Sequence, residues 1–248
     1  AIPRTDADVN RPVSPLPLVS VGMPVYNAQS TIDSALTAIR RQSHPHLQVI
    51  VSDNASTDGT VAACRAHVAA DPRVLLIEQP RNVGAPANFC DVLRRATGPY
   101  FMWAAADDTW APSFIERNLM ALEAEPRLVA SVSRVRFMDD TGREDDLGTR
   151  PFTGDVATNV ASFLSRPGPN SRFYGLFRRE VLVACLIEQG CLAWDWAIMA
   201  RTLTYGWHGR VDEVLLFRGV RGESQQLLPV IERYNQGVGR LVPLLAFS

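Results

Sequence analysis

Continuous apolar runs and amphipathic segments alternate along the first half of the chain. The apolar runs predict strands over residues 18–23, 47–52, 74–78 and 100–105. Apolar positions at a helical spacing predict helices from residue 30 or 31, over 60–70, over about 86–97 and over about 112–124. Strands that alternate with helices through short connections form right-handed crossovers. The expected fold class is therefore α/β, with a doubly wound, mostly parallel central sheet.

The alternation becomes irregular after residue 125. The sequence then predicts a strand over 128–138, an acidic turn over 139–146, a strand over 172–177, a helix from about 178, a helix over 195–205 and short strands over 210–217. We expect the parallel order to break in this smaller, mixed region. Residues 225–248 are interpreted as one helix packed on the body or as a truncated connection, and residues 1–17 as a Pro-rich lead.

Charge and composition exclude several classes of function. The 248 residues carry 25 basic and 26 acidic side chains, which leaves no basic surface for nucleic acid and no strong attraction to an anionic membrane. All 25 basic residues are arginine, so a lysine-bearing phosphate loop, a kinase lysine and a Schiff-base amine are excluded. Four cysteines without a CxxC pair indicate a reduced, cytoplasmic interior. No apolar run approaches the roughly 20 residues of a membrane-spanning helix.

Polar residues lie in the loops that follow consecutive predicted strands. They are Asn27, Asp53, Asn82 and the adjacent pair Asp107 and Asp108. Ligands of an open parallel sheet bind beyond the carboxyl ends of its strands, so these loops predict a site. Two adjacent carboxylates suit Mg²⁺ or Mn²⁺, which complete their coordination with water and substrate phosphates. The alternative is that the pair caps the helix that follows.

Two further loop residues have a ligand-binding and a plain interpretation. Asp53 can accept a hydrogen bond from the ring N–H of a nucleobase, or it can open an Asx-turn. Gly84 precedes a predicted helix, where the backbone can approach a ligand closely or simply turn. No GxGxxG follows a strand, which disfavours a dinucleotide cofactor, and the absence of HExxH and GxSxG disfavours the common zinc proteases and serine hydrolases.

Four segments taken together resemble a known family. Val21 to Asn27 (VGMPVYN), Asp53 to Thr60 (DNASTDGT), Arg81 to Gly84 (RNVG) and Ala106 to Asp108 (ADD) resemble, in this order, the signature of family 2 glycosyltransferases with the GT-A fold. The resemblance covers 18–122 most closely and 172–218 less closely. It implies a single catalytic domain over 18–248, with a nucleotide-sugar-binding half over 18–125 and an acceptor-binding half over 126–248.

The implied activity is the inverting transfer of a sugar from a nucleotide-diphosphate donor to an acceptor hydroxyl. The resemblance assigns the donor nucleotide to Pro24, Tyr26, Asn27, Asp53, Asn82, Gly84 and Asp107. It assigns the metal, Mn²⁺ or Mg²⁺, to Asp108. Ala106 stands where the family often has the first aspartate of an acidic triplet, which puts the affinity for metal in question.

Inversion needs a base on the side of the sugar opposite the diphosphate, because the acceptor hydroxyl loses its proton as it attacks. Asp195, at the start of the helix expected over 195–205, resembles the family's base, although Trp194 replaces the first residue of the commoner Glu-Asp pair. Asp195 can instead be a helix cap. Trp194 can stack on a sugar or pack in the core.

Five other residues are weaker site candidates. His208 has two interpretations: it completes the metal site, or it packs inside the protein. Arg218 and Arg221 also have two: they clamp the diphosphate with hydrogen bonds, or they lie on the surface. Arg172 and Tyr174 precede a segment that borders the acceptor site in the family.

The expected partners are a UDP, TDP or GDP sugar and a hydroxyl acceptor, either a sugar or a lipid-linked group. Polysaccharide, glycolipid and glycosylated-metabolite biosynthesis are the processes that the resemblance favours, in the cytoplasm or at the inner face of the membrane. Two alternatives remain open: a nucleotidyltransferase, and a non-catalytic protein of the same fold that binds nucleotide sugars. A nucleotidyltransferase normally has a Gly-rich loop after its first strand, where this chain has Pro-Val-Tyr-Asn.

Overall fold

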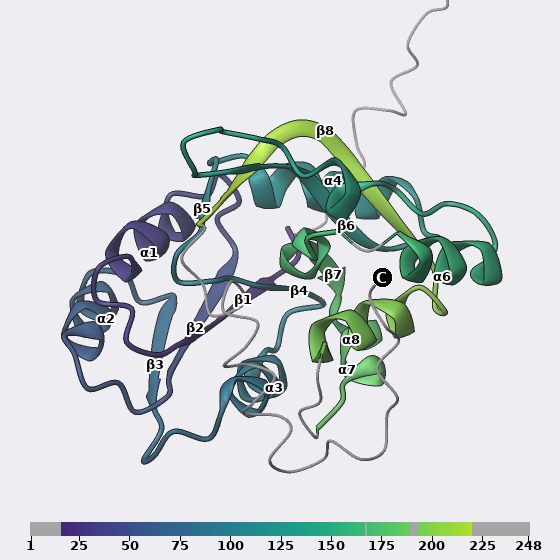
Figure 1. Cartoon of the computed structure of the whole chain (residues 1–248). Helices are drawn as coiled ribbons and strands as arrows, with labels where there is room; N and C mark the ends of the chain where they lie inside the picture. Colours follow the sequence, from purple (N-terminus) through teal and green to yellow (C-terminus); the bar gives the residue numbers. More distant parts are fainter. Residues whose placement is uncertain (1–15, 167, 189–192, 220–248) are drawn as a thin grey trace, which may run out of the picture.

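The computed structural model describes residues 16–166, 168–188 and 193–219 (Figure 1). Its central sheet has eight strands in the order β3-β2-β1-β4-β7-β6-β8-β5. The strands are β1 (Val19–Val25), β2 (Leu47–Asp53), β3 (Val74–Glu78), β4 (Tyr100–Trp103), β5 (Thr109–Trp110), β6 (Leu128–Phe137), β7 (Leu176–Arg178) and β8 (Trp207–Arg218). The helices are α1 (Ile32–Arg40), α2 (Thr60–Ala70), α3 (Ala85–Arg95), α4 (Phe114–Ala124), α5 (Asp146–Thr149), α6 (Val156–Ser165), α7 (Arg179–Cys185) and α8 (Trp194–Thr202), with the 3-10 turn η2 (Ser171–Tyr174).

The first four strands are parallel, as the sequence predicts. β1 is the centre of this part of the sheet, with β2 on one side and β4 on the other. The chain runs outward from β1 through β2 to β3 and then crosses back to β4, so the strand order reverses next to β1. Ligand sites in such sheets lie beyond the carboxyl ends of the strands at this reversal.

Helices cover both faces of the sheet, and this explains the uninterrupted apolar runs of its strands. Val49 and Val51 pack into the core that includes residues of α1 and α4, whereas Ile50 packs into the core that includes residues of α3, α7 and α8. Successive side chains of a strand point to opposite faces, so a strand covered on both sides needs apolar residues at every position. The expected α/β class and mostly parallel sheet are confirmed.

The parallel order breaks at β7, which runs antiparallel to both β4 and β6. β8 is one long strand over Trp207–Arg218, where the sequence predicts short ones, and it pairs parallel with β6 through several register shifts. The strand expected over 172–177 is wrong, because residues 171–174 form η2 and only Leu176–Arg178 is a strand. Helices α5 and α6 were not predicted.

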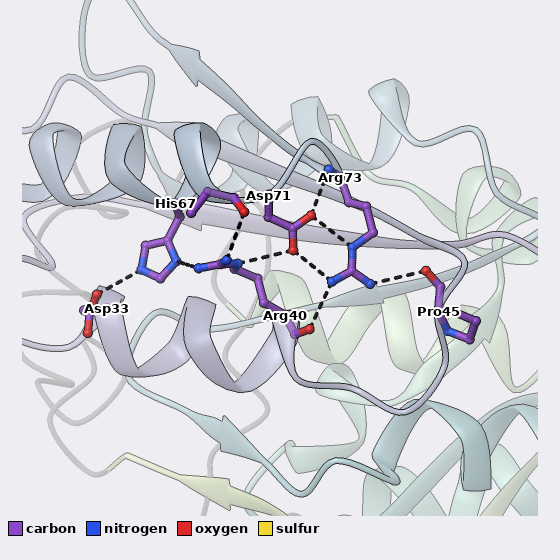
Figure 2. Close-up of polar contacts among 7 residues, drawn as sticks. Asp33, Arg40, Pro45, His67, Asp71 and Arg73 are labelled. Atoms are coloured by element: carbon purple, nitrogen blue, oxygen red, sulfur yellow. Dashed lines mark hydrogen bonds and ion pairs between the residues drawn. The ribbon is translucent and has the colours of Figure 1, made fainter.

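A polar network joins α1 to α2 (Figure 2). Asp71, which follows α2, accepts hydrogen bonds from Arg40 of α1 and from Arg73. Arg40 also donates to His67 Nδ1, so the other ring nitrogen carries the proton that His67 donates to Asp33. The network fixes the two helices against each other.

Within the described residues, no helix combines the length and apolar character needed to cross a membrane. The expectations for residues 1–15 of the Pro-rich lead and for 225–248 lie outside the described residues.

Candidate active site at the carboxyl edge of the sheet

The loops after β1 and β2 are tied together by hydrogen bonds. Val25 and Asp53 are register partners at the ends of these strands. Asn27, in a left-handed conformation with φ of 48°, donates its backbone N–H to Ser56 Oγ at 2.9 Å. Its side-chain Oδ1 accepts from the backbone N–H of Thr57 at 2.9 Å. Asn27 therefore shapes the loop, and the adjacent Tyr26 stays 44% exposed at the edge.

Asp53 orders its loop through one carboxylate oxygen and leaves the other without a partner among the described residues. It is 2% exposed, and its Oδ2 accepts from the backbone N–H of Ser56 at 2.9 Å, which orders the loop. Its Oδ1 is buried and has no hydrogen-bond partner in the part of the chain that the structure describes. A buried carboxylate oxygen without a partner costs free energy unless a ligand supplies a donor, so this atom is suited to a ligand N–H.

The Asn82 loop is positioned by a residue that the sequence did not indicate. Asn54 donates to Asn82 Oδ1 at 2.9 Å and accepts from the backbone N–H of Val83 at 2.8 Å. Asn82 Oδ1 also accepts from the N–H of Gly84, which has a φ of 85° and precedes α3. A Cβ at Gly84 would meet nothing within 4 Å, so the glycine is required by its backbone conformation rather than by crowding.

Asp107 and Asp108 follow β4 and do not cap a helix, because α4 begins only at Phe114. They contact the end of β8 instead. The backbone N–H of Gly219 donates to Asp108 Oδ1 at 2.9 Å, and a Cβ on Gly219 would lie 2.6 Å from two Asp107 oxygens. Glycine is therefore the residue that allows β8 to end this close to the acidic pair.

Asp108 is 1% exposed, and burial raises the pKa of its carboxyl to about 7, against the opposing effect of Arg218. Its Oδ2 has no hydrogen-bond partner among residues 16–166, 168–188 and 193–219, and the Nε of Arg218 lies 3.7 Å away. Asp53 is the last residue of β2 and Asp108 follows β4. Because β2 and β4 run parallel to β1 on either side of it, both aspartates lie at the carboxyl edge of the sheet.

A chain of contacts links this acidic pair to Asp195. Arg218 donates through Nη1 to Ser171 Oγ at 3.0 Å. The next residue before Ser171, Asn170, donates through Nδ2 to Asp195 Oδ2 at 2.9 Å. Asp195 is the second residue of α8, whose N-cap position is held by Ala193, so the cap interpretation of Asp195 is wrong.

Tyr174 packs against Arg218, the residue that links the acidic pair to Ser171. The guanidinium of Arg218 lies 4.7 Å from the centre of its ring. Burial raises the pKa of Tyr174 well above its usual value, and the negative charges of Asp108, Asp195 and Asp107 add to this shift. The structural link between the acidic pair and Asp195 consists of the contact of Arg218 with Asp108, its hydrogen bond to Ser171, and the hydrogen bond from the neighbouring Asn170 to Asp195.

His208 is not part of a metal site with Asp108. It is 1% exposed near the start of β8, whereas Gly219 and the acidic pair lie at the other end of this strand. Its Nε2 contacts Thr202 Oγ1 at 3.1 Å, and burial lowers the pKa of the ring well below its usual value. The packed interpretation of His208 is correct.

Arg172 and Trp194 are also interior residues whose polar groups bond to other parts of the protein, and their expected roles at the diphosphate or acceptor stay predictions. Arg172 is 2% exposed, donates to the carbonyl of Arg150 and lies over the ring of Phe152. Trp194 is 7% exposed, donates to the carbonyl of Ile187 and packs in the aromatic core. Arg221 lies outside the described residues.

The residues present fit a divalent cation anchored mainly by phosphate and water. The described residues contain no group of three or more His, Cys, Asp or Glu side chains that could hold a metal. Asp108 nevertheless offers one buried carboxylate oxygen without a hydrogen bond, next to Asp107. One or two carboxylates are the protein's usual share of a Mg²⁺ site that also binds substrate phosphates.

Solved structures define the class of this fold. TarS of S. aureus, crystallised with UDP-GlcNAc, matches with a TM-score of 0.67 at 18% identity over 83% of this chain and 59% of that chain. The mannosyltransferase PcManGT of Pyrobaculum calidifontis, in complex with GDP-Man and Mn²⁺, matches with a TM-score of 0.64 at 21% identity over 87% and 61%. The fold is the GT-A fold of glycosyltransferases.

Sequence comparison then gives the family. The chain belongs to glycosyl transferase family 2, whose pattern matches residues 20–183. TuaG of Bacillus subtilis, named as a glycosyltransferase of teichuronic acid biosynthesis, is 36% identical over 103 residues, which are 42% of this chain and 41% of TuaG. The chondroitin synthase of Escherichia coli is 29% identical over 128 residues, 51% of this chain and 18% of the synthase. The chain spans less than half the length of these two relatives.

Proposed function

We propose that this chain transfers a sugar from a nucleotide-diphosphate donor to an acceptor hydroxyl, with inversion, in polysaccharide biosynthesis. The observation that carries the proposal is the chain of contacts from Asp108 through Arg218 and Ser171 to Asn170 and Asp195. It joins carboxylates of the two halves of the chain, 18–125 and 126–248, which we propose form a single catalytic domain. Family membership and the activities in the relatives' names support the reaction class.

The donor nucleotide occupies the loops after β1, β2 and β3. Asp53 Oδ1, buried and without a hydrogen bond in the described structure, accepts the ring N–H of the base. Pro24, Tyr26, Asn27, Asn82 and Gly84 line the base and ribose, and Asp107 reaches the ribose. UDP and GDP are the nucleotides to test first, because structures of the same fold are in complex with UDP-GlcNAc and GDP-Man.

Asp108 would hold Mn²⁺ or Mg²⁺ through Oδ2. A divalent cation bound there would neutralise charge that grows on the departing diphosphate. Arg218 and Tyr174 lie beside this position, and Arg218 contributes positive charge at the same place.

Asp195 takes the acceptor proton. Asn170 holds Oδ2, and Oδ1 has no hydrogen-bond partner within the described residues, so it can accept the proton as the acceptor oxygen bonds to the anomeric carbon. The bond between that carbon and the diphosphate oxygen breaks in the same step, and the electron pair leaves with the diphosphate. Trp194, being buried, excludes water from beneath α8 rather than stacking on the acceptor.

An assay of nucleoside diphosphate release tests the proposal. The chain is incubated with Mn²⁺, UDP-GlcNAc or GDP-mannose, and short hexose, N-acetylhexosamine or hexuronic acid oligosaccharides. We expect release that depends on one acceptor class. Asp195→Asn should lower the rate by about 10²- to 10⁴-fold and leave the donor affinity, measured by calorimetry, within about twofold.

Asp212→Asn is the matched control, because the side chain of Asp212 is 77% exposed on β8 and the substitution makes the same chemical change away from the site. It should leave the rate unchanged. Full activity of Asp195→Asn would remove Asp195 as the base. Tight donor binding with no release for any acceptor would favour the non-catalytic alternative.

A further inference from the structure

The link between Arg218 and Asp108 is a buried arginine–carboxylate contact without a hydrogen bond. Arg143–Asp139, Arg210–Asp212 and Arg134–Asp212 also lack hydrogen bonds, but each of these pairs has an exposed partner, whereas the Arg218 and Asp108 side chains are 15% and 1% exposed. Arg73 donates to Asp71 at 2.8 Å and Arg134 to Glu144 at 2.6 Å, with hydrogen bonds in both pairs. The Nε of Arg218 lies 3.7 Å from Asp108 Oδ2 without a hydrogen bond, and neither atom has another hydrogen-bond partner in the described residues. The contact is electrostatic only.

The firm contacts of Arg218 are with the acceptor-side half. Its Nη1 donates to Ser171 Oγ at 3.0 Å, and its guanidinium lies over the ring of Tyr174. The Arg218 side chain is only 15% exposed, so Asp108 experiences its charge in a poorly solvated environment. The charge of Arg218 thus compensates the buried Asp108 carboxylate, while the hydrogen bond of Arg218 goes to Ser171. If Arg218 loses its contact with Asp108, it still has Ser171 and Tyr174 as partners.

We propose that Arg218 is the resident counter-cation of Asp108, that a divalent cation replaces it at Oδ2, and that Arg218 thereby sets the affinity of the site for metal. The proposal rests on the proposed function, which places the metal at Asp108. Two cations cannot share one carboxylate oxygen at contact distance without strong repulsion. Metal binding therefore requires Arg218 to move away from Oδ2, towards the partners that already hold it.

Arg218 has opposite effects on the metal-free and the metal-bound protein. Without metal, it compensates a carboxylate that is 1% exposed and would otherwise be buried without a counter-charge. With metal, the same guanidinium repels the bound cation. A purely structural arginine would stabilise both states, and this difference makes the proposal testable without an activity assay.

The test is Mn²⁺ binding to the nucleotide-free protein, followed by the electron paramagnetic resonance signal of free Mn²⁺. Arg218→Gln should bind Mn²⁺ at least about tenfold more tightly than wild type, the factor expected from removing a unit charge about 5 Å from a divalent ion even at the dielectric constant of water. Arg136→Gln is the matched control, because Arg136 lies on β6 in register with Phe217 and pairs with Glu144 instead. Its affinity should change by less than about twofold.

Thermal melting gives a second readout. Metal-free Arg218→Gln should melt below wild type, and a fixed Mn²⁺ concentration should raise its melting temperature by more than it raises that of wild type. If Arg218→Gln does not fold, the Mn²⁺ binding measurement is made on Ser171→Ala instead. This substitution removes the hydrogen bond from Arg218 to Ser171 Oγ and keeps the charge of Arg218. The Ser171 hydroxyl is one of the partners that hold Arg218 away from Oδ2, so its loss should make the displacement of Arg218 less favourable and weaken Mn²⁺ binding by about two- to threefold.

Unchanged or weaker Mn²⁺ binding in Arg218→Gln would overturn the proposal, as would unchanged or tighter binding in Ser171→Ala where Arg218→Gln does not fold. Asp108→Asn separates this failure from that of the proposed function. If Asp108→Asn abolishes Mn²⁺ binding while the Arg218 result is negative, the metal site stands and the exchange is wrong. If Asp108→Asn binds Mn²⁺ like wild type, the metal assignment fails, and the exchange fails with it.

Discussion

Between α1 and α2, the polar groups of the network have their hydrogen bonds: both oxygens of Asp71 accept from arginines (Figure 2). At the carboxyl edge of the sheet, Asp53 Oδ1 and Asp108 Oδ2 are at least as well buried but have no hydrogen-bond partner in the described residues. The same residue type thus stabilises the fold in one place and costs stability in the other. Unsatisfied buried acceptors are expected where selection for ligand binding opposes selection for stability.

The comparison predicts that removing Asp71 changes stability and leaves binding unaffected. Asp71→Ala leaves Arg40 and Arg73 without their carboxylate, and breaking such a partly buried network should lower the free energy of unfolding by about 3 kcal/mol. Urea denaturation measures this loss. The donor affinity of the folded variant should stay within about twofold of wild type, and a large loss of affinity would mean that the network also shapes the donor site.

The two buried aspartates should give opposite dependences of stability on pH. Hydrogen bonds from Arg73 hold the pKa of Asp71 well below its usual range, so its stabilising contribution is present above about pH 4 and is lost as the pH falls through its folded pKa. Burial raises the pKa of Asp108 to about 7, so its contribution is present below about pH 4 and is lost as the pH rises towards 7.

Metal-free wild type should therefore lose stability relative to Asp108→Asn between about pH 4 and pH 7, by about 3 kcal/mol. Urea denaturation of both proteins in a chelating buffer at several pH values gives the difference. A difference that is constant over this range would show that the carboxyl group of Asp108 titrates normally in the folded protein.

Much of the first half of the chain, residues 18–125, could be predicted from the sequence, because its signals are local. Strands covered on both faces appear as continuous apolar runs, and the loops after them carry Asn and Asp next to the strand end. The residues that were missed act over long distances along the chain. Gly219 bonds to Asp108, 111 positions away, and nothing near Gly219 indicates this partner.

The inward position of three candidate residues has another cause. Arg172, His208 and Trp194 have side chains of suitable chemistry, but a sequence does not show whether such a side chain points into the core or towards a site. The alternation that predicted a strand over 172–177 belongs in part to a 3-10 turn, which turns Arg172 inward and leaves Asn170 and Ser171 to contact Asp195 and Arg218. Tertiary contacts decide such segments, and local pattern does not.

A substitution at Asp53 should have the opposite effect to Asp71→Ala, because it should weaken binding and leave stability unchanged or higher. In Asp53→Asn, the amide oxygen can still accept from Ser56, but the oxygen that faces the ligand becomes an NH₂ group. Binding of the nucleoside diphosphate should weaken by about 30-fold, about 2 kcal/mol, while the melting temperature stays equal or rises. Calorimetry and thermal melting measure the two effects. Asp58→Asn, in the same loop and bonded to Thr60, is the control that should lower stability without loss of affinity.

The smallest expected effect concerns Asn170, whose Nδ2 holds Asp195 and whose Oδ1 has no hydrogen-bond partner in the described structure. Asn170→Ala lets the Asp195 carboxylate rotate away from the acceptor, so kcat should fall about tenfold, while KM for the donor changes by less than about twofold. Steady-state kinetics with the active donor and acceptor pair measures both.

A double-mutant cycle decides whether Asn170 acts through Asp195 or merely supports the fold. If Asn170 positions the base, Asn170→Ala has no further effect on kcat in the Asp195→Asn background, because the group that it orients is already inactive. Asn159→Ala is the matched control, since Asn159 is equally buried and bonds to Gly154 near α6. It should lower stability and leave kcat unchanged. Equal losses of kcat in the wild-type and Asp195→Asn backgrounds would show that Asn170 acts independently of Asp195.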